Sequence, residues 1–196
     1  MADPARAVLD TCILAPSRMR DFLLSLAAES AYLPCWNRVI LAELEYLERK
    51  RHAAHGLEPD DASRAANLLI GRMGQVFPGA LVDGWEHLEG SFGLPDPADE
   101  HVAATATVAR ASVIVTSNLR DFPDLALPAA VRVESPAAFA ARLARRDPAS
   151  AAAALTAMSS RLRRPPMTPT EVLDYLETRN GFAEAAELLR IWLTHR

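Results

Sequence analysis

The sequence predicts an α/β fold with a mostly parallel sheet and helices on both of its faces. Short apolar segments of strand length alternate with longer segments whose apolar residues recur at helical spacing. The segments 7–14 and 112–116 are apolar on both faces, which is typical of buried parallel strands. After Pro136 only helical patterns follow, which predicts a helical extension at the C-terminal side.

The individual elements follow from apolar spacing, caps and breakers. Strands are expected at 7–14, 32–36, 80–82, 112–116 and 131–133. Helices are expected at 18–28, 37–52, 60–76, 98–110, 137–146, 149–163, 169–179 and 182–194. Pro34 predicts an edge position for the second strand, because proline donates no ladder hydrogen bond. Asp60 or Asp61 is expected to cap the third helix. The predicted domains are an α/β domain over 1–146 and a helical extension over 147–196.

The composition is that of a chain with a sizeable core. Half of the 196 residues are hydrophobic, so wholesale disorder is not expected. No apolar run reaches the roughly 18 residues that cross a bilayer, and the first residues lack the layout of a secretory signal. A cytoplasmic protein without membrane contact is therefore expected. Cys12 and Cys35 are too few for a disulfide framework or a zinc site, and both are expected to be buried thiols in apolar surroundings.

The charge is distributed unevenly along the chain. The formal net charge is −4, but residues 1–140 carry 12 basic and 19 acidic side chains, whereas residues 141–196 carry 9 and 6. An acidic body can hold metal ions, and a basic tail can meet phosphates or an acidic partner. No glycine motif for cradling phosphates is present.

Polar residues follow two of the predicted buried strands. Ligands of parallel α/β sheets bind beyond the carboxyl ends of the strands, so residues at these ends are candidates for a site. Asp10 interrupts the first strand, and Asn118 and Asp121 follow the strand 112–116. Each aspartate also has a plain structural interpretation, Asp10 as a cap and Asp121 as a turn residue.

Further acidic residues lie on or before predicted helices. Glu43 stands inside an apolar stretch and is expected on the buried side of its helix or at its margin, whereas Glu48 is expected to be solvated. Asp99 opens a helix, where an acid also favours the positive N-terminal end of the helix dipole. Asp96 is expected in the turn that precedes this helix.

Convergence of four acids from distant segments would make a metal site. Such a cluster repels itself without cations, and carboxylate oxygens are the ligands that Mg²⁺ prefers. A divalent cation held in this way can activate water and neutralise the charge that develops on a phosphodiester. Sequence spacing alone leaves both this cluster and the separate structural roles open.

These residues resemble the PIN-domain nucleases. The resemblance is carried by four motifs in order, over roughly residues 6–135: Val8-Leu9-Asp10-Thr11, Leu41-Ala42-Glu43-Leu44, Asp96-Pro97-Ala98-Asp99-Glu100-His101-Val102-Ala103-Ala104 and Ile114-Val115-Thr116-Ser117-Asn118-Leu119-Arg120-Asp121. It implies a three-layer α/β/α sandwich and a cut in RNA that depends on magnesium or manganese.

The resemblance also assigns roles to residues. It places Asp10, Glu43 and Asp99 at metal-ligand positions. The later strand of the family usually ends in an aspartate where this chain has Asn118. Asn118 can supply a carbonyl oxygen, and Asp121 is near enough in sequence to supply the missing charge. The expected catalytic set is therefore Asp10, Glu43, Asp99, Asn118 and Asp121, with Asp10, Asp99 and Asp121 as metal ligands.

The layout of the whole chain is similar to the VapC branch of bacterial toxins. This similarity implies a structured RNA substrate, an antitoxin that blocks the site, and a homodimer. Thr11 and the arginines Arg161, Arg163 and Arg164 are the expected RNA contacts. A solvated charge run is the alternative for the arginines, and the tail helices are expected to pack against the body or a second subunit.

Two other functions compete with the nuclease. A phosphatase of the haloacid-dehalogenase type also begins with a strand that ends in aspartate, but it needs a second acid two residues later, where this chain has Cys12. A degenerate PIN module would bind RNA or a protein partner without cutting. Asn118 is the feature that favours this second alternative.

Overall fold

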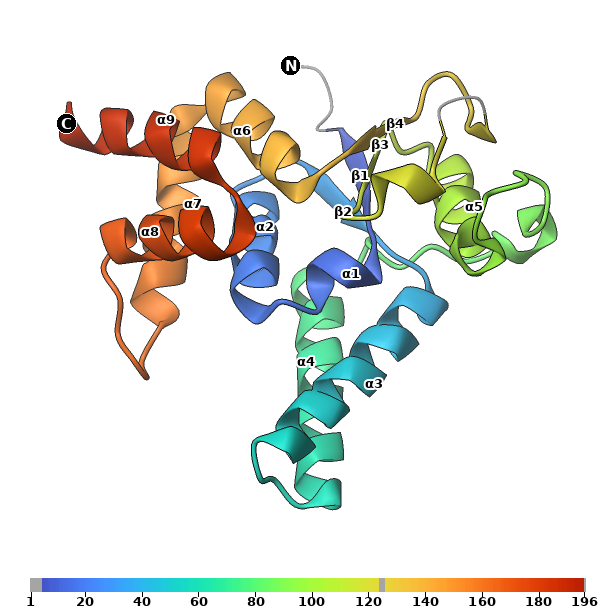
Figure 1. The fold of residues 1–196 in the computed structure, drawn as a ribbon, viewed down its shortest axis with the longest axis horizontal. Helices are drawn as coiled ribbons and strands as arrows, with labels where there is room; N and C mark the ends of the chain where they lie inside the picture. Colours follow the sequence, from blue (N-terminus) through green and yellow to red (C-terminus); the bar gives the residue numbers. More distant parts are fainter. Residues whose placement is uncertain (1–4, 124–125, 196) are drawn as a thin grey trace. The chain divides into compact units, whose positions relative to one another are not determined.

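Four short strands form one sheet. In the computed structural model, which describes residues 5–123 and 126–195, they are β1 (Arg6–Leu9), β2 (Leu33–Cys35), β3 (Val113–Val115) and β4 (Arg132–Glu134). The strand order is β2-β1-β3-β4 (Figure 1). β1 and β3 are parallel, with Ala7 opposite Val113 and Leu9 opposite Val115. The parallel sheet and its helices confirm the predicted α/β class.

The chain divides into two compact units. The sheet unit comprises residues 6–15 and 34–133, and the helical unit comprises residues 16–33 and 134–196 together with Ala5. All the acids predicted to form the site belong to the sheet unit. The domain boundary expected between residues 146 and 147 stays a prediction. Within the described ranges, no helix is long and apolar enough to cross a membrane.

The sheet unit carries its helices around β1 and β3. Its helices are α1 (Thr11–Leu14), α3 (Arg38–Ala54), α4 (Pro59–Val76) and α5 (Glu100–Val108), with short 3₁₀ turns η1 (Glu86–Leu88), η2 (Pro97–Asp99) and η3 (Leu119–Asp121). α5 packs against β1 and β3, and α3 and α4 lie side by side as a hairpin (Figure 1). The side chains of β3 are fully buried, as expected for a central parallel strand.

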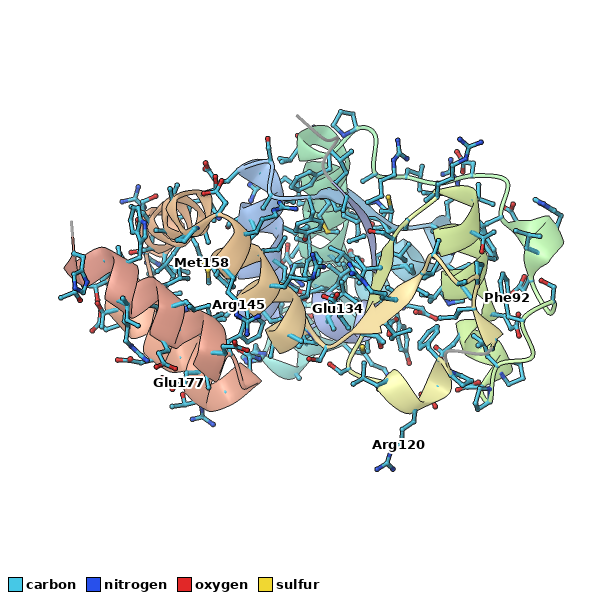
Figure 2. All side chains as sticks on the ribbon, turned by 90° about the horizontal axis from the view of Figure 1, so that it is seen from above. Phe92, Arg120, Glu134, Arg145, Met158 and Glu177 are labelled. Carbon is cyan, nitrogen blue, oxygen red and sulfur yellow. The ribbon has the colours of Figure 1, made fainter. Side chains whose placement is uncertain are left out.

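The helical unit is an assembly of amphipathic helices. It contains α2 (Ser17–Ala28), α6 (Pro136–Arg146), α7 (Pro148–Arg161), α8 (Pro169–Asn180) and α9 (Ala183–Thr194). Phe22 meets Phe182 edge-on, with ring centroids 5.9 Å apart. Met158 is fully buried on α7 (Figure 2). α7 and α8 contact α2, so the tail helices pack on an earlier segment of the same chain.

The expected strand 7–14 is wrong beyond Leu9. β1 ends there, and the backbone carbonyl of Asp10 accepts the N–H groups of Ile13 at 3.2 Å and Leu14 at 3.3 Å, which starts the short helix α1. A continuous apolar run fits a buried helix as well as a buried strand, so periodicity could not separate the two. The weak strand expected at 80–82 is reduced to an isolated parallel bridge between Trp36 and Leu81.

Two details of the long hairpin also differ from expectation. Glu58 holds the cap position of α4 without a side-chain hydrogen bond, and Asp60 and Asp61 lie in the first turn, where they favour the helix dipole. The side chain of Glu48 is 2% exposed instead of solvated. It pairs with Arg51, and its Oε2 lies 3.7 Å from Nε2 of His52.

Candidate active site

Asp10 is held where β1 and β3 end together. Its backbone N–H continues the ladder to the carbonyl of Val115 at 3.1 Å, and the residue holds the N-cap position of α1. The residue is 5% exposed. Oδ2 accepts hydrogen bonds from Oγ1 of Thr116 at 2.6 Å and from Sγ of Cys12 at 3.0 Å. Two donors therefore fix this nearly buried carboxylate.

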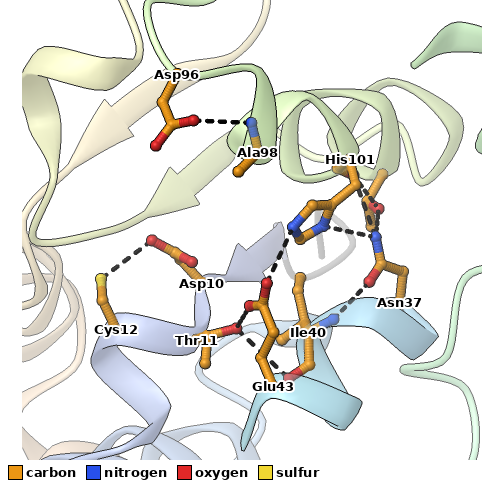
Figure 3. Close-up of polar contacts among 10 residues, drawn as sticks. Asp10, Thr11, Cys12, Asn37, Ile40, Glu43, Asp96, Ala98 and His101 are labelled. Carbon is orange, nitrogen blue, oxygen red and sulfur yellow. Dashed lines mark hydrogen bonds and ion pairs between the residues drawn. The ribbon is translucent and has the colours of Figure 1, made fainter. Parts of the chain in front are cut away.

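Glu43 reaches the same region from α3. The residue is exposed, with 45% of its side chain accessible, whereas the sequence predicted the buried side of the helix or its margin. Oγ1 of Thr11 donates to its Oε2 at 2.5 Å (Figure 3). Its Oε1 lies 3.9 Å from Nε2 of His101. Thr11 follows Asp10 directly in the sequence, so its hydrogen bond to Glu43 links the second acid to the segment that carries the first.

The pKa of Asp99 is shifted by the charges of the other acids in the cluster. The residue ends η2, begins α5 and is half-buried. Burial is the largest cause that raises its pKa, to about 6, and repulsion from neighbouring carboxylates adds to this shift. The carboxylates that raise the pKa are, in decreasing order of effect, Asp10, Asp96, Asp121 and Glu43. The structure thus brings the predicted acids into one electrostatic field.

The strand end after β3 places Asn118 and Asp121 differently. Asn118 is exposed, and its backbone N–H donates to Oγ1 of Thr116 at 3.0 Å. Asp121 is half-buried at the end of η3 and contributes to the field at Asp99. Between them, Arg120 points outward into solvent (Figure 2).

The turn before α5 has both a structural and an electrostatic effect. Asp96 accepts the N–H of Ala98 at 2.9 Å, as the turn interpretation predicted (Figure 3). Its negative charge also raises the pKa of Asp99.

The donor set fits a hard divalent cation. All the acids around Asp99 offer carboxylate oxygens, and their mutual repulsion is what a bound cation relieves. Within the ranges 5–123 and 126–195, no three acidic, histidine or cysteine side chains stand close enough to hold one ion together. The oxygen chemistry of the acids around Asp99 fits magnesium or manganese.

Two buried polar residues near Glu43 were not among the site residues predicted from the sequence. His101 is 4% exposed, and Asn37, at the N-terminus of α3, is fully buried. Burial lowers the pKa of His101, while the charges of Glu43, Asp10 and Glu89 oppose this shift. The available signals were the position of Asn37 at a helix start and that of His101 two residues after Asp99.

Cys12 and Thr116 are the other residues that sequence reasoning missed. Thr116 is fully buried, and Cys12 accepts the N–H of Ser117 at 3.2 Å while contacting Asp10. The apolar surroundings predicted for Cys12 are therefore wrong, whereas Cys35 is buried as predicted. Burial and then the charge of Asp10 raise the pKa of Cys12 to about 11, so the thiol is protonated at neutral pH.

The expected RNA contacts remain predictions. The hydroxyl of Thr11 has a protein partner in Glu43. In the helical unit, Arg161 donates to Oγ of Ser25 at 2.6 Å and lies 3.7 Å from Asp21. The two other arginines, Arg163 and Arg164, are exposed in the segment between α7 and α8.

Comparison with known families defines the class of this protein. Residues 6–120, more than half of the chain, match the PIN domain, so the chain belongs to the PIN-domain family. Residues 136–191 match the VapC50 C-terminal domain. The protein is therefore a VapC-like PIN-domain protein with a C-terminal domain of the VapC50 type. No curated protein and no solved structure matches it significantly.

Proposed function

We propose that this protein is a magnesium- or manganese-dependent endoribonuclease that hydrolyses RNA phosphodiester bonds. The observation that carries the proposal is the crowding of carboxylates around Asp99, whose pKa rises to about 6 through burial and through repulsion from Asp10, Asp96, Asp121 and Glu43. Carboxylates that resist ionisation in this way are typical of functional sites. A divalent cation, when bound, supplies Lewis-acid activation of water and neutralises the charge that develops on the phosphate.

The residues of this chain have distinct roles in the proposed reaction. Asp10, Asp99 and Asp121 would hold the cation, and Glu43 would complete the acidic set. Thr116 and Cys12 orient the carboxylate of Asp10 by donating to its Oδ2. Asp121, which lies within the field of Asp99, is favoured over the exposed Asn118 as the fourth acid.

RNA cleavage by the purified protein tests this function. Structured RNAs are incubated with the full chain and Mn²⁺ or Mg²⁺, with a chelator control and an Asp10→Asn variant. The matched control is Asp83→Asn, because Asp83 is an exposed acid of the same unit that pairs with Arg38. We expect cutting by the wild type and Asp83→Asn only. Equal cutting by Asp10→Asn, or cutting that survives the chelator, would contradict a carboxylate–metal nuclease.

A second candidate is a PIN module that binds RNA or a protein partner without cutting it. The observations that favour it are the amide of Asn118 in place of a carboxylate and the absence of a compact three-ligand group within the described residues. Binding of the same RNAs by wild type and Asp10→Asn in the presence of Mn²⁺ separates the two candidates. Equal binding with no cutting by either protein supports the binding module.

The biological setting that we propose is the toxin of a toxin–antitoxin pair. The match to the VapC50 C-terminal domain supports it. The setting implies a cytoplasmic protein, a cognate antitoxin and a homodimer. Induced expression in a bacterial host should arrest growth with the wild type but not with Asp10→Asn at equal protein levels. Equal growth with both proteins would contradict the toxin assignment.

A further inference from the structure

The side chain of Asn37 has one possible orientation. It caps α3, and its Oδ1 accepts the backbone N–H of Ile40 at 2.8 Å. A backbone N–H can only donate, so the atom that faces Ile40 must be the carbonyl oxygen of the amide. The amide nitrogen of Asn37 therefore faces the opposite way, toward α5 (Figure 3).

This orientation determines which nitrogen of His101 carries the proton. Nδ2 of Asn37 lies 2.8 Å from Oγ1 of Thr105, 3.1 Å from Nδ1 of His101 and 3.2 Å from the carbonyl oxygen of His101. The amide nitrogen has two hydrogens and only donates, so its contact with Nδ1 is a hydrogen bond only where Nδ1 accepts. Oγ1 of Thr105 takes one hydrogen, and Nδ1 is the nearer of the two acceptors for the other. A neutral imidazole that accepts at Nδ1 has its own hydrogen on Nε2. The hydroxyl of Thr105 donates its hydrogen to the carbonyl oxygen of His101 at 2.6 Å. Oγ1 of Thr105 can therefore accept the hydrogen bond from Asn37.

The protonated nitrogen of His101 faces Glu43. Nε2 lies 3.9 Å from Oε1 of Glu43, while Thr11 donates to Oε2 of the same carboxylate at 2.5 Å (Figure 3). The distance to Nε2 is longer than a hydrogen bond, so a hydrogen on Nε2 acts on the carboxylate by electrostatic attraction. One oxygen of Glu43 thus accepts a hydrogen bond from α1, and the other faces Nε2 of His101 on α5.

This tautomer argues against a general-base role for His101. The lone pair of Nδ1 is engaged by Asn37, and Nε2 has no lone pair in this tautomer. His101 can therefore act on the reaction only through the groups that it contacts.

We propose that Asn37 and His101 form a positioning relay, in which the amide of Asn37 fixes the Nε2–H tautomer of His101 and this tautomer orients the carboxylate of Glu43 opposite Thr11. The relay rests on the proposed nuclease function only where its effect on cleavage is concerned. The tautomer itself is a property of the metal-free protein. Groups that orient metal ligands from behind typically change metal affinity or activity by about 10- to 100-fold when they are removed.

The tautomer is tested first, by long-range ¹H–¹⁵N NMR of the full chain without metal. The signals of His101 are assigned by their loss in the His101→Gln variant. We expect the ¹⁵N shifts of a neutral ring with the hydrogen on Nε2. In Asn37→Ser, which keeps a capping oxygen but loses the amide donor, we expect mixed tautomers. A hydrogen on Nδ1 in the wild type would overturn the relay, and so would an unchanged spectrum in a folded Asn37→Ser protein.

A pair of substitutions at His101 tests the effect on Glu43. Glutamine can place an amide donor near the position of Nε2, whereas asparagine reaches only the position of Nδ1. We expect His101→Gln to keep Mn²⁺ affinity and cleavage within about 5-fold of the wild type, and His101→Asn to lose about 10- to 100-fold. Equal losses in two variants with equal melting temperatures would show a merely structural residue and overturn the relay.

A double-mutant cycle shows whether the effect passes through Glu43. In a Glu43→Gln background, His101→Asn should cause little further loss of Mn²⁺ affinity or cleavage, because the carboxylate that it positions is gone. Full additivity of the two losses would overturn the relay. If the wild type cuts no RNA, the nuclease proposal fails, but the NMR spectra and the Mn²⁺ titrations still decide the relay.

Discussion

Two carboxylates that are neighbours in sequence, Asp99 and Glu100, experience opposite environments. The pKa of Asp99 rises to about 6 because of burial and then because of surrounding negative charge. Glu100 is 3% exposed, and this burial alone would raise its pKa, yet the backbone N–H groups of the loop 90–94 hold its pKa below the usual value. Its Oε1 accepts from Leu94 at 2.9 Å, and its Oε2 accepts from Gly90 and Phe92, each at 3.1 Å.

The contrast separates a carboxylate that is repelled by its neighbours from one that is satisfied by hydrogen bonds. Glu100 has donors on both oxygens, so its ionised form is satisfied within the fold and ties the loop to α5. Asp99 is surrounded by acids, so its ionised form is destabilised unless a positive charge lies nearby. Burial alone does not distinguish the two residues; the sign of the charges and dipoles around each carboxylate does.

The largest expected effect is the loss of activity in Asp99→Asn. Removing one charge of the cluster should lower RNA cleavage by at least about 100-fold, which corresponds to about 2.7 kcal/mol. The stability of the metal-free protein should not fall, because a repelled charge is removed. Cleavage rates and urea unfolding in the presence of a chelator measure both. A marked loss of metal-free stability would place Asp99 with Glu100 as a structural acid.

The next effect is the loss of stability in Glu100→Gln. The amide offers one acceptor oxygen and turns an N–H donor toward the backbone N–H groups of the loop. We expect the free energy of unfolding to fall by about 1.5–3 kcal/mol, the range for hydrogen bonds to a charged group. Urea unfolding with chelator measures the change. An unchanged midpoint and slope would show that these hydrogen bonds add nothing to the fold.

The two acids should also give opposite pH dependences. The folded-state pKa of Glu100 is lowered, so its stabilisation is present above the unfolded pKa near 4.5 and is lost as pH falls through the folded value. The folded-state pKa of Asp99 is raised from 3.8 to about 6, so its ionised form destabilises the metal-free protein increasingly as pH rises from about 4 to 6.

Unfolding of the wild type and both variants between pH 3 and 8 tests these signs. The advantage of the wild type over Glu100→Gln should shrink as the solution becomes more acidic. The disadvantage of the wild type relative to Asp99→Asn should grow from about pH 4 to about pH 6 and stay constant at higher pH. Parallel curves for all three proteins would remove the contrast between the two acids.

The smallest effects are expected from the two donors on Asp10. Oγ1 of Thr116 donates at 2.6 Å, whereas the thiol of Cys12 is a weak donor at 3.0 Å. We expect Thr116→Val to lower cleavage by about 10-fold and Cys12→Ala by about 3-fold, from the usual strength of charged and weak hydrogen bonds. Initial rates at saturating Mn²⁺ measure the difference. The reverse order would make the thiol the main support of Asp10.

Much of the architecture could be predicted from the sequence. The long amphipathic segments predicted α2, α3 and the tail helices, because apolar residues at a period of 3.6 lie on one face only in an α-helix. Pro34 predicted an edge strand, and β2 is at the edge of the sheet. The end of β1 could not be predicted, because the apolar run through Leu14 fits a buried strand and a buried helix equally well.

The candidate acids could be named from the sequence, since they close apolar strands or open helices in the order typical of PIN domains. The sequence by itself therefore determined the fold class, the acidic residues and the family to which they point. Only the tertiary structure decided that Asp99 is repelled and Glu100 satisfied, and that Asn37 fixes a tautomer of His101 from 64 residues away. Charges and hydrogen bonds act over a few ångströms in space, and a linear sequence does not contain those distances.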